Sequence, residues 1–166
     1  MTVLLEKTHQ RNNFDCGDEA LNFYLKHQAS QDVKRKLSAC FVYTEHNTNQ
    51  ILGYYTLSAG SIPYQDIPET FNKKLPSGYQ SIPVILIGRL AVSKTNQGKG
   101  LGALLLIDAL QRCYEKHTEL GAWAIVVYPK NESAKQFYLH FGFITLPQSG
   151  KLFIPMKLVV NLFKNQ

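Results

Sequence analysis

Three glycines in five positions, Gly98, Gly100 and Gly102, are the first candidates for chemistry in this sequence. They separate an almost wholly apolar run from a helical pattern, and glycine lets the backbone approach a ligand closely. The free N–H groups at the start of a helix, with the positive end of its dipole, attract anions. Lys99 adds a positive charge. We expect residues 97–102 to bind a phosphate group, with an ordinary glycine-containing turn as the alternative.

The spacing of these glycines argues against two common nucleotide-binding loops. A Walker loop requires Gly-x-x-x-x-Gly-Lys followed by Ser or Thr, and the sequence contains no such segment. A dinucleotide-binding loop requires Gly-x-Gly-x-x-Gly and an acidic residue after the next strand. Here the spacing is Gly98-x-Gly100-x-Gly102, and the next predicted strand ends at residue 127 without an acid. The pattern therefore indicates a different phosphate-bearing ligand.

Hydrophobic periodicity predicts the elements that must position this loop. Strands are expected at residues 3–6, 39–44, 51–61, 84–92, 122–127, 144–146 and 152–160. Helices are expected at residues 19–36, 69–75, 98–117 and 131–141. Helices and hairpins mixed around one sheet are typical of an α/β or α+β domain.

Length and charge narrow the class of protein. The 166 residues suit one domain over 1–166, because a chain of this size buries roughly 70% of its unfolded surface. The net charge of +6 favours encounter with nucleic acid or phosphate-bearing ligands, unless the chain is simply a basic protein. No apolar run is long enough for a signal peptide or a membrane span. We therefore expect a cytoplasmic protein without a membrane partner.

Thiols and imidazoles show no arrangement that suggests a nucleophile or a metal site. The three cysteines, Cys16, Cys40 and Cys113, are odd in number and widely spaced, which fits reduced thiols rather than disulfides. Cys113 falls in a helical pattern, where a small apolar core residue is expected. None of the five histidines has metal-ligand spacing. We expect no metal and no catalytic thiol.

The segment Gln97-x-x-Gly100-x-Gly102 resembles the acetyl-CoA signature of the GCN5-related N-acetyltransferases, Gln/Arg-x-x-Gly-x-Gly/Ala. Residues 131–143 resemble a second pattern of that family, Asn-x-x-Ala-x-x-Phe-Tyr-x-x-x-Gly-Phe. The two patterns occur in the family's order and at its distance, and the resemblance covers residues 84–143. Together the two are far more specific than the six-residue loop alone.

This resemblance implies a fold, a co-substrate and a set of binding residues. The fold is a mixed, mostly antiparallel central sheet flanked by helices, with a splay between the strands near 84–92 and 122–127. The co-substrate is acetyl-CoA, and the acetyl group passes directly to an amine. The backbone of Leu90 and Val92 would pair with the pantetheine arm, and the Val92 N–H would polarise the thioester oxygen. The implied binding residues are Leu90, Ala91, Val92, Gln97, Gly98, Lys99, Gly100, Leu101, Gly102, Ala103, Asn131 and Phe137.

Tyr138 is the residue that the resemblance implies as general acid toward the departing thiolate. A phenol with a pKa of about 10 and a thiol with a pKa of about 8.5 make this role chemically sensible. Helical spacing alone would favour a core aromatic, because Phe137, Phe141 and Phe143 are its neighbours. Asn131 has two compatible interpretations, as a ligand of the cofactor and as a helix cap. No general base is apparent, and an α-amine that titrates near about 7.7–8.0 is partly neutral without one.

Residues 14–17, 53–58 and 82–92 narrow the resemblance to the acetyltransferase toxins of bacterial toxin–antitoxin pairs, which are paired with ribbon-helix-helix antitoxins. This resemblance implies acetylation of the α-amine of aminoacyl-tRNA, which blocks translation, and it suggests a homodimer. One departure is Tyr128-Pro129, where that group is expected to have Asp-Ala. It puts the preference for acyl group or substrate in doubt.

Four basic residues are candidates for contacting charged tRNA. Arg89 interrupts an apolar strand, so it must be paired or face a cleft. The toxin resemblance implies that it contacts the tRNA acceptor end, and a buried ion pair is the alternative. Lys34, Arg35 and Lys36 form a cluster that could contact phosphates, or a solvated helix end. Two other functions stay open: an acetyltransferase of small-molecule or protein amines, and a CoA-binding or partner-binding module without catalysis.

Overall fold

A computed structural model describes residues 1–164 of the chain. These residues form two compact units: Met1–Ser58 with Ile87–Leu110, and Ala59–Leu86 with the described residues from Gln111 onward. We call them the first unit and the second unit, and each has its own hydrophobic core. The single domain expected over 1–166 stays a prediction.

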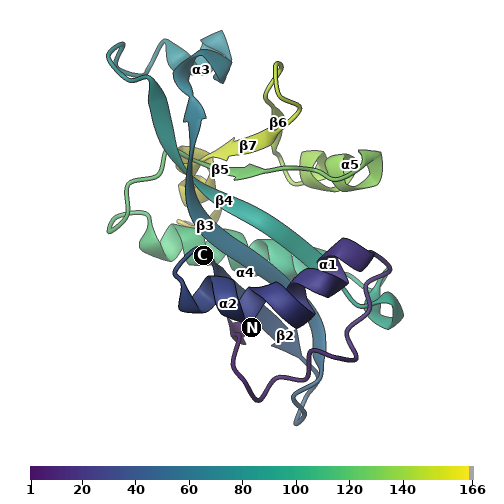
Figure 1. The fold of residues 1–166 in the computed structure, drawn as a ribbon. Coiled ribbons are helices and arrows are strands. Elements are labelled where there is room, and N and C mark those ends of the chain that lie inside the picture. The colour runs from purple at the N-terminus through teal and green to yellow at the C-terminus, as the bar shows by residue number, and fades with distance from the viewer. Residues whose placement is uncertain (165–166) are drawn as a thin grey trace. The chain divides into compact units, whose positions relative to one another are not determined.

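Seven strands form one sheet in the order β1-β2-β3-β4-β5-β7-β6 (Figure 1). The pairs β1–β2, β2–β3, β5–β7 and β6–β7 are antiparallel. The expected α/β fold with a mostly antiparallel sheet is therefore confirmed, while the splay near 84–92 and 122–127 stays a prediction. The strands are β1 (Val3–Leu4), β2 (Ala39–Thr44), β3 (Ile51–Pro63), β4 (Ser81–Val92), β5 (Ala124–Val127), β6 (Ile144–Thr145) and β7 (Leu152–Pro155).

Helices flank the sheet, and one expected helix has an irregular interior. The helix expected at 19–36 is α1 (Glu19–Phe23), a π-helical turn η1 (Tyr24–Gln28) and α2 (Ala29–Lys34). Asp18 caps its start, because its side chain accepts a hydrogen bond from the Leu21 N–H. The others are α3 (Glu69–Asn72), α4 (Leu101–Lys116), α5 (Glu132–His140) and α6 (Met156–Phe163), with 3₁₀ turns at Tyr64–Asp66 and Lys94–Asn96.

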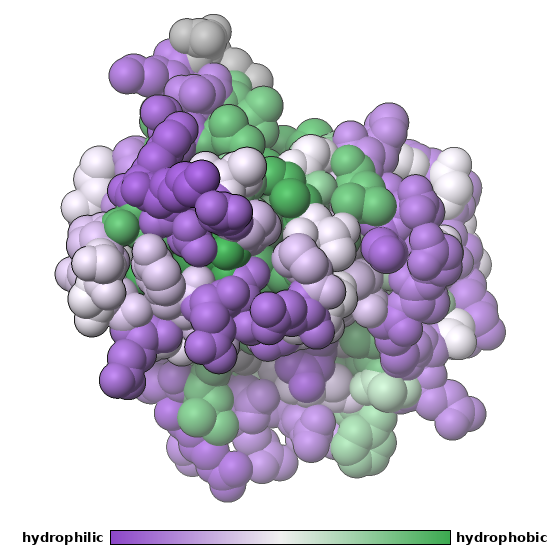
Figure 2. Space-filling model, turned by 90° about the horizontal axis from the view of Figure 1, so that it is seen from above, coloured by the Kyte–Doolittle hydropathy of each residue, from purple (hydrophilic) through white to green (hydrophobic). Residues whose placement is uncertain are grey.

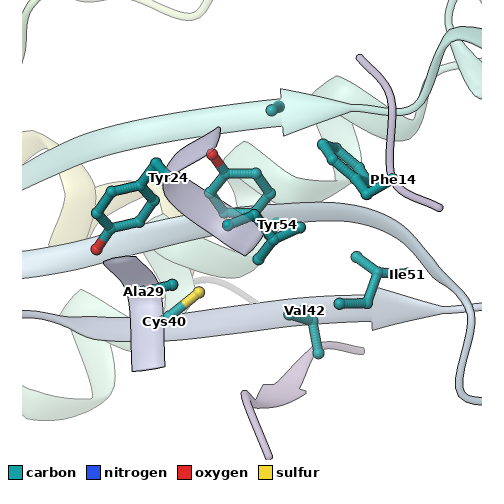
Figure 3. Packing of buried hydrophobic residues seen from close by; sticks show 9 residues of the cluster. Phe14, Tyr24, Ala29, Cys40, Val42, Ile51 and Tyr54 are labelled. Carbon is teal, nitrogen blue, oxygen red and sulfur yellow. The ribbon is translucent and has the colours of Figure 1, made fainter. Parts of the chain in front are cut away.

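In the first unit, α1 and α2 cover one face of the strands and α4 covers the other (Figure 1). Neighbouring residues of β3 point to opposite faces. Tyr54 packs with Tyr24 and Phe14 at ring-centroid distances of 6.4 and 5.5 Å (Figure 3). On the other face, Gly53 leaves room for α4: a Cβ there would lie 2.8 Å from the Leu105 side chain. This layering fixes the end of β4 against the start of α4.

The second unit has an aliphatic and aromatic core of its own. It is built from the end of β3, the start of β4, and strands β5 to β7. The rings of Phe71, Trp123 and Phe153 pack together, with centroid distances of 5.3 to 6.3 Å. Helix α6 contacts β5 and β7, and α5 contacts β7.

The strand expected at 152–160 is wrong beyond residue 155. β7 ends at Pro155, and residues 156–163 form α6. The β-branched pair Val159-Val160 favoured a strand, but Met156 and Val159 are buried at the three-residue spacing of a helix face. Proline fixes its own φ and fits the start of a helix, which here follows directly.

Several large apolar side chains are exposed, among them Leu104, Ile107, Leu158 and Leu162. Figure 2 shows one face on which hydrophilic residues predominate and hydrophobic residues form separate patches. Among residues 1–164, no helix is long and apolar enough to span a lipid bilayer.

Candidate active site

The glycine turn has the backbone that its sequence predicts. Gly98 and Gly100 have φ angles of +72° and +81°, values that cost other residues about 1–2 kcal/mol. A Cβ at either position would meet no atom within 4 Å, so backbone conformation rather than crowding requires glycine here. Gly102 lies in the first turn of α4, which begins at Leu101. Its first N–H groups have no partner within the helix, and the turn is open for an anion.

The Gln97 side chain is a clamp: it hydrogen-bonds to two backbone segments and is not free to bind a ligand. Its Nε2 donates hydrogen bonds to the carbonyl oxygens of Cys16 and Val92, at 2.8 and 2.9 Å. The side chain therefore ties the end of β4 to the chain segment around residue 16. Its predicted contact with a cofactor is left to the backbone.

A second set of bonds braces the same turn, and sequence reasoning missed it. The Lys94 N–H donates to the Asp15 carbonyl at 2.8 Å, and the Lys94 ammonium lies 3.1 Å from the Asp15 carboxylate. Hydrogen bonds from the Gly17 N–H, from the Asn22 side chain and from Lys94 lower the pKa of Asp15 to about 2. Asp15 is therefore ionised at neutral pH. The only signal in the sequence was the resemblance of residues 14–17 to the toxin group.

The end of β4 carries the residues expected along the pantetheine arm. Leu90 and Val92 are half-buried and Ala91 is buried against the aromatic core of the first unit. The Ser93 N–H donates to the Leu52 carbonyl at 2.8 Å, so pairing with β3 continues past the end of the strand. Lys99 and Ala103, also expected at the cofactor, are exposed and half-buried.

Tyr138 is buried in the second unit but has a free hydroxyl. The residue is 8% exposed, and its ring packs edge-on against Phe137 and Phe143. Burial raises the pKa of Tyr138 to about 12, so the phenol stays protonated at neutral pH. No hydrogen bond to it is formed by residues 1–164. Every fully buried polar side-chain atom in that range has a hydrogen-bond partner. Because the Tyr138 hydroxyl has none, it must be accessible to solvent, where it is able to donate.

Asn131 and Phe137, the two other residues of segment 131–143 expected at the cofactor, each make contacts within the fold. The Asn131 Oδ1 accepts a hydrogen bond from the Ala134 N–H at 2.8 Å, so this side chain is a helix cap. Its amide donors are left for a ligand. Phe137 is half-buried and lies 5.1 Å from the Phe141 ring, which makes it part of an aromatic cluster.

Arg89 lies in the first unit, where it covers an aromatic ring. Its guanidinium carbon is 3.5 Å from the centroid of Tyr24. Lys34, Arg35 and Lys36 are exposed in the same unit at the end of α2. Lys36 has a φ of +62°, and its residue type and position fit a helix C-terminus as well as a phosphate contact.

The structure thus brings the glycine turn, the end of β4, Arg89 and the basic cluster into one unit. It places Tyr138, Asn131 and Phe137 in the other unit. Among residues 1–164, no three His, Cys, Asp or Glu side chains gather as a metal site would require. Two glycines with left-handed backbones and space beside them, at the start of a long helix, fit a pyrophosphate group.

The family follows from a comparison with known domains. Residues 36–145 match the acetyltransferase (GNAT) domain. The chain therefore belongs to the GNAT acetyltransferase family, as its two sequence patterns predicted.

Individual members of this family resemble the chain over most of its length. A tRNA-acetylating toxin of Mycobacterium tuberculosis is 36% identical over 135 residues, which cover 81% of this chain and 78% of that protein. The structure of AtaT complexed with acetyl-methionyl-tRNAfMet has a TM-score of 0.90 and 31% identity, over 98% of each chain. A tyrosine-to-phenylalanine mutant of the AtaT toxin, bound to the C-terminus of the antitoxin AtaR and acetyl-CoA, has a TM-score of 0.82 and 28% identity, over 99% of this chain and 97% of that chain. These matches confirm the fold.

Proposed function

We propose that this enzyme transfers the acetyl group of acetyl-CoA to the α-amine of aminoacyl-tRNA and so blocks translation as a toxin. The observation that carries the proposal is the similarity to AtaT in complex with acetyl-methionyl-tRNAfMet, which extends over 98% of the chain. The name of the mycobacterial relative, a tRNA-acetylating toxin, points to the same reaction. The net charge of +6 suits a polyanionic substrate.

Direct transfer, without an acyl-enzyme, fits the thiols of the chain. Acetyl-CoA supplies the acetyl group as a thioester; a nitrogen–carbon bond forms as the carbon–sulfur bond breaks. The amine gives up one proton and the leaving sulfur accepts one. Burial raises the pKa of Cys40 and of Cys113 to about 12, and it also raises that of Cys16. None of these thiols is therefore a ready nucleophile at neutral pH.

The residues of the site have distinct roles in this proposal. The backbone of Leu90 and Val92 binds the pantetheine arm, and the Val92 N–H stabilises negative charge on the thioester oxygen. The backbone of residues 97–103 binds the pyrophosphate, with Lys99 adding charge. Tyr138 donates to the departing sulfur, and its free, protonated hydroxyl supports that role. Asn131 and Phe137 bind the cofactor alongside it.

Partners and setting complete the proposal. We place the enzyme in the cytoplasm, where aminoacyl-tRNA is found, and we assign residues 1–166 to one catalytic domain. The AtaT structure with the C-terminus of AtaR supports regulation by an antitoxin. We propose a ribbon-helix-helix antitoxin and a homodimeric toxin, as the sequence resemblance implies. Sedimentation of the purified chain, alone and mixed with such an antitoxin, tests both.

One labelling experiment tests the reaction. The chain is incubated with radiolabelled acetyl-CoA and, separately, with charged tRNA, deacylated tRNA, polyamines and lysine-rich peptide. We expect label only with charged tRNA, and we expect mild alkali to release it as an N-acetyl amino acid. Label confined to polyamines or peptide would support the alternative, a GNAT enzyme for small-molecule or protein amines. Acetyl-CoA binding without label in any acceptor would indicate a non-catalytic module.

A further inference from the structure

The contact between Arg89 and Tyr24 has the geometry of a cation held against an aromatic face. The guanidinium carbon lies 3.5 Å from the ring centroid, well inside the limit of about 6 Å for a cation–π interaction. Arg89 is half-buried, and Tyr24 is only 2% exposed. Stacking occupies one face of the planar guanidinium and leaves its in-plane N–H groups free to donate.

The ring under Arg89 is itself fixed at several points. The Tyr24 hydroxyl donates to an Asp32 carboxylate oxygen and is hydrogen-bonded to the Ser38 hydroxyl, both at 3.1 Å. The ring stacks with Tyr54 at 6.4 Å, and the Tyr54 hydroxyl donates to the Leu21 carbonyl at 2.8 Å. Tyr24 cannot shift without breaking these contacts. The surface on which Arg89 rests is therefore rigid.

Arg89 has no acidic partner within residues 1–164. Asp32, which belongs to the same hydrogen-bond network, accepts a hydrogen bond from the Tyr24 hydroxyl and forms no ion pair with Arg89. A half-buried cation without a counter-charge is costly to the fold. A planar, fixed guanidinium with free donors matches the oxygens of a phosphate group. The arrangement therefore indicates a site for an anion.

Two kinds of phosphate are available to this enzyme, and the position of Arg89 favours one. The CoA pyrophosphate is expected at the glycine turn, beyond the end of β4. Arg89 precedes Val92 by three residues, or about 10 Å of strand, and so lies on the side away from that turn. The exposed basic residues Lys34, Arg35 and Lys36 belong to the same unit as Arg89. Nucleic-acid phosphate is the better match.

We propose that Tyr24 is a positioning residue that holds Arg89 for one phosphate of the acceptor end of charged tRNA. This inference rests on the proposed function and on the contact of Arg89 with the tRNA acceptor end that the sequence resemblance implied, and it adds to them the residue that orients Arg89. Asp32 and Ser38 act on Arg89 only through the Tyr24 hydroxyl.

The first test is the salt dependence of tRNA binding. Arg89→Gln should reduce the slope of log affinity against log salt by about 0.7–0.9, the loss of one phosphate contact. It should raise the KM for charged tRNA by about ten- to a hundredfold and leave the KM for acetyl-CoA unchanged. Arg89→Lys keeps the charge but loses the planar guanidinium. It should retain the wild-type salt slope, and its KM for charged tRNA should lie between those of the wild type and Arg89→Gln.

The second test separates positioning from ordinary stability. Tyr24→Leu should raise the KM for charged tRNA in the wild-type background. It should cause no further rise in Arg89→Gln, because the two substitutions remove the same contact with tRNA. Tyr24→Phe keeps the ring and removes its anchors, so it should fold and show the same coupling more weakly. Tyr55→Phe is the matched control: it loses the hydrogen bond to Asp108 in the same unit, on the face of β3 opposite to Tyr54 and Tyr24. It should lower stability and leave the KM for tRNA unchanged.

The outcomes distinguish this inference from the proposed function. If the wild type acetylates charged tRNA but Arg89→Gln changes neither slope nor KM, the inference alone is wrong. If Arg89→Gln weakens acetyl-CoA binding and not tRNA binding, the phosphate belongs to the cofactor and the inference is again wrong. Independent effects of Tyr24 and Arg89 would overturn the positioning role. A wild type that neither binds nor acetylates tRNA would overturn both proposals.

Discussion

The change Tyr138→Phe removes one hydroxyl and nothing else from the second unit. The ring keeps its edge contacts with Phe137 and Phe143, and no hydrogen bond within residues 1–164 is lost. We therefore expect the free energy of unfolding to change by less than about 0.5 kcal/mol. Any large effect of this substitution should appear in the rate.

The expected loss of rate follows from the pKa of the phenol. Burial raises the pKa of Tyr138 to about 12, whereas a thiol titrates near about 8.5. Complete proton transfer from the phenol to the leaving thiolate is therefore uphill by roughly 3.5 pKa units, or about 5 kcal/mol. A hydrogen bond to the developing thiolate is the stronger contribution, and bonds to charged groups are worth about 1.5–3 kcal/mol. We expect the acetyl-transfer rate of Tyr138→Phe to fall by about ten- to a hundredfold.

The assay is single-turnover acetylation of charged tRNA, which isolates the chemical step from product release. The hydroxyl carries its proton below a pKa of about 12 and loses it above that value, so Tyr138 should cause no fall in the wild-type rate up to about pH 10. A folded Tyr138→Phe that keeps more than about half of the wild-type rate would refute the reasoning. A loss above about a thousandfold would instead indicate full proton transfer.

Three further predictions concern the Gln97 clamp at the glycine turn, a glycine of the first unit and one buried thiol. Gln97→Ala should cost about tenfold in Kd for acetyl-CoA, because it loses the hydrogen bonds to two carbonyl oxygens. Gln97→Glu should cost more, because its carboxylate would also repel those oxygens, and Gln97→Arg, which can still donate, should bind better than either. Gly53→Ala should destabilise by about 1–3 kcal/mol in urea, since its Cβ would lie 2.8 Å from Leu105; Gly78→Ala, with open space around it, is the control. Burial raises the pKa of Cys113 to about 12, so the folded state favours the protonated thiol. This contribution to the free energy of unfolding is complete below about pH 8.5, where the thiol of an unfolded chain titrates, and is lost as pH rises toward 12. Cys113→Ala should therefore reduce the alkaline slope of the unfolding free energy by about 1.4 kcal/mol per pH unit, and an unchanged slope would contradict this.

Local patterns in the sequence predicted most of the elements because their causes are local. The positive φ angles of Gly98 and Gly100 follow from glycine spacing between a strand and a helix. The boundary at Pro155 was missed because β-branched residues after it also suit a strand. Burial of Met156 and Val159 against the second unit decides for a helix. Tertiary packing overrides propensity there, and a single sequence does not display packing.

The contacts that hold the candidate site together were not predictable, since they join distant parts of the chain. Asp15 and Lys94 are far apart in sequence, and neither charge pattern nor periodicity links them. The same holds for Arg89 and Tyr24. The sequence did identify Arg89 as a charge that needs a partner or a cleft. It could not tell that an aromatic face lies beneath it.

The glycine turn shows why residues outside a signature matter to it. Left-handed backbones at Gly98 and Gly100 are accessible to glycine but are not the only states open to it, so the free turn would sample many conformations. The clamp from Gln97 to the Cys16 and Val92 carbonyls, with the Asp15–Lys94 brace, fixes the entry to the turn. Ordering the loop before the ligand arrives lowers the entropy that binding must offset. The affinity for acetyl-CoA should therefore depend on residues 15–17 as well as on the glycines.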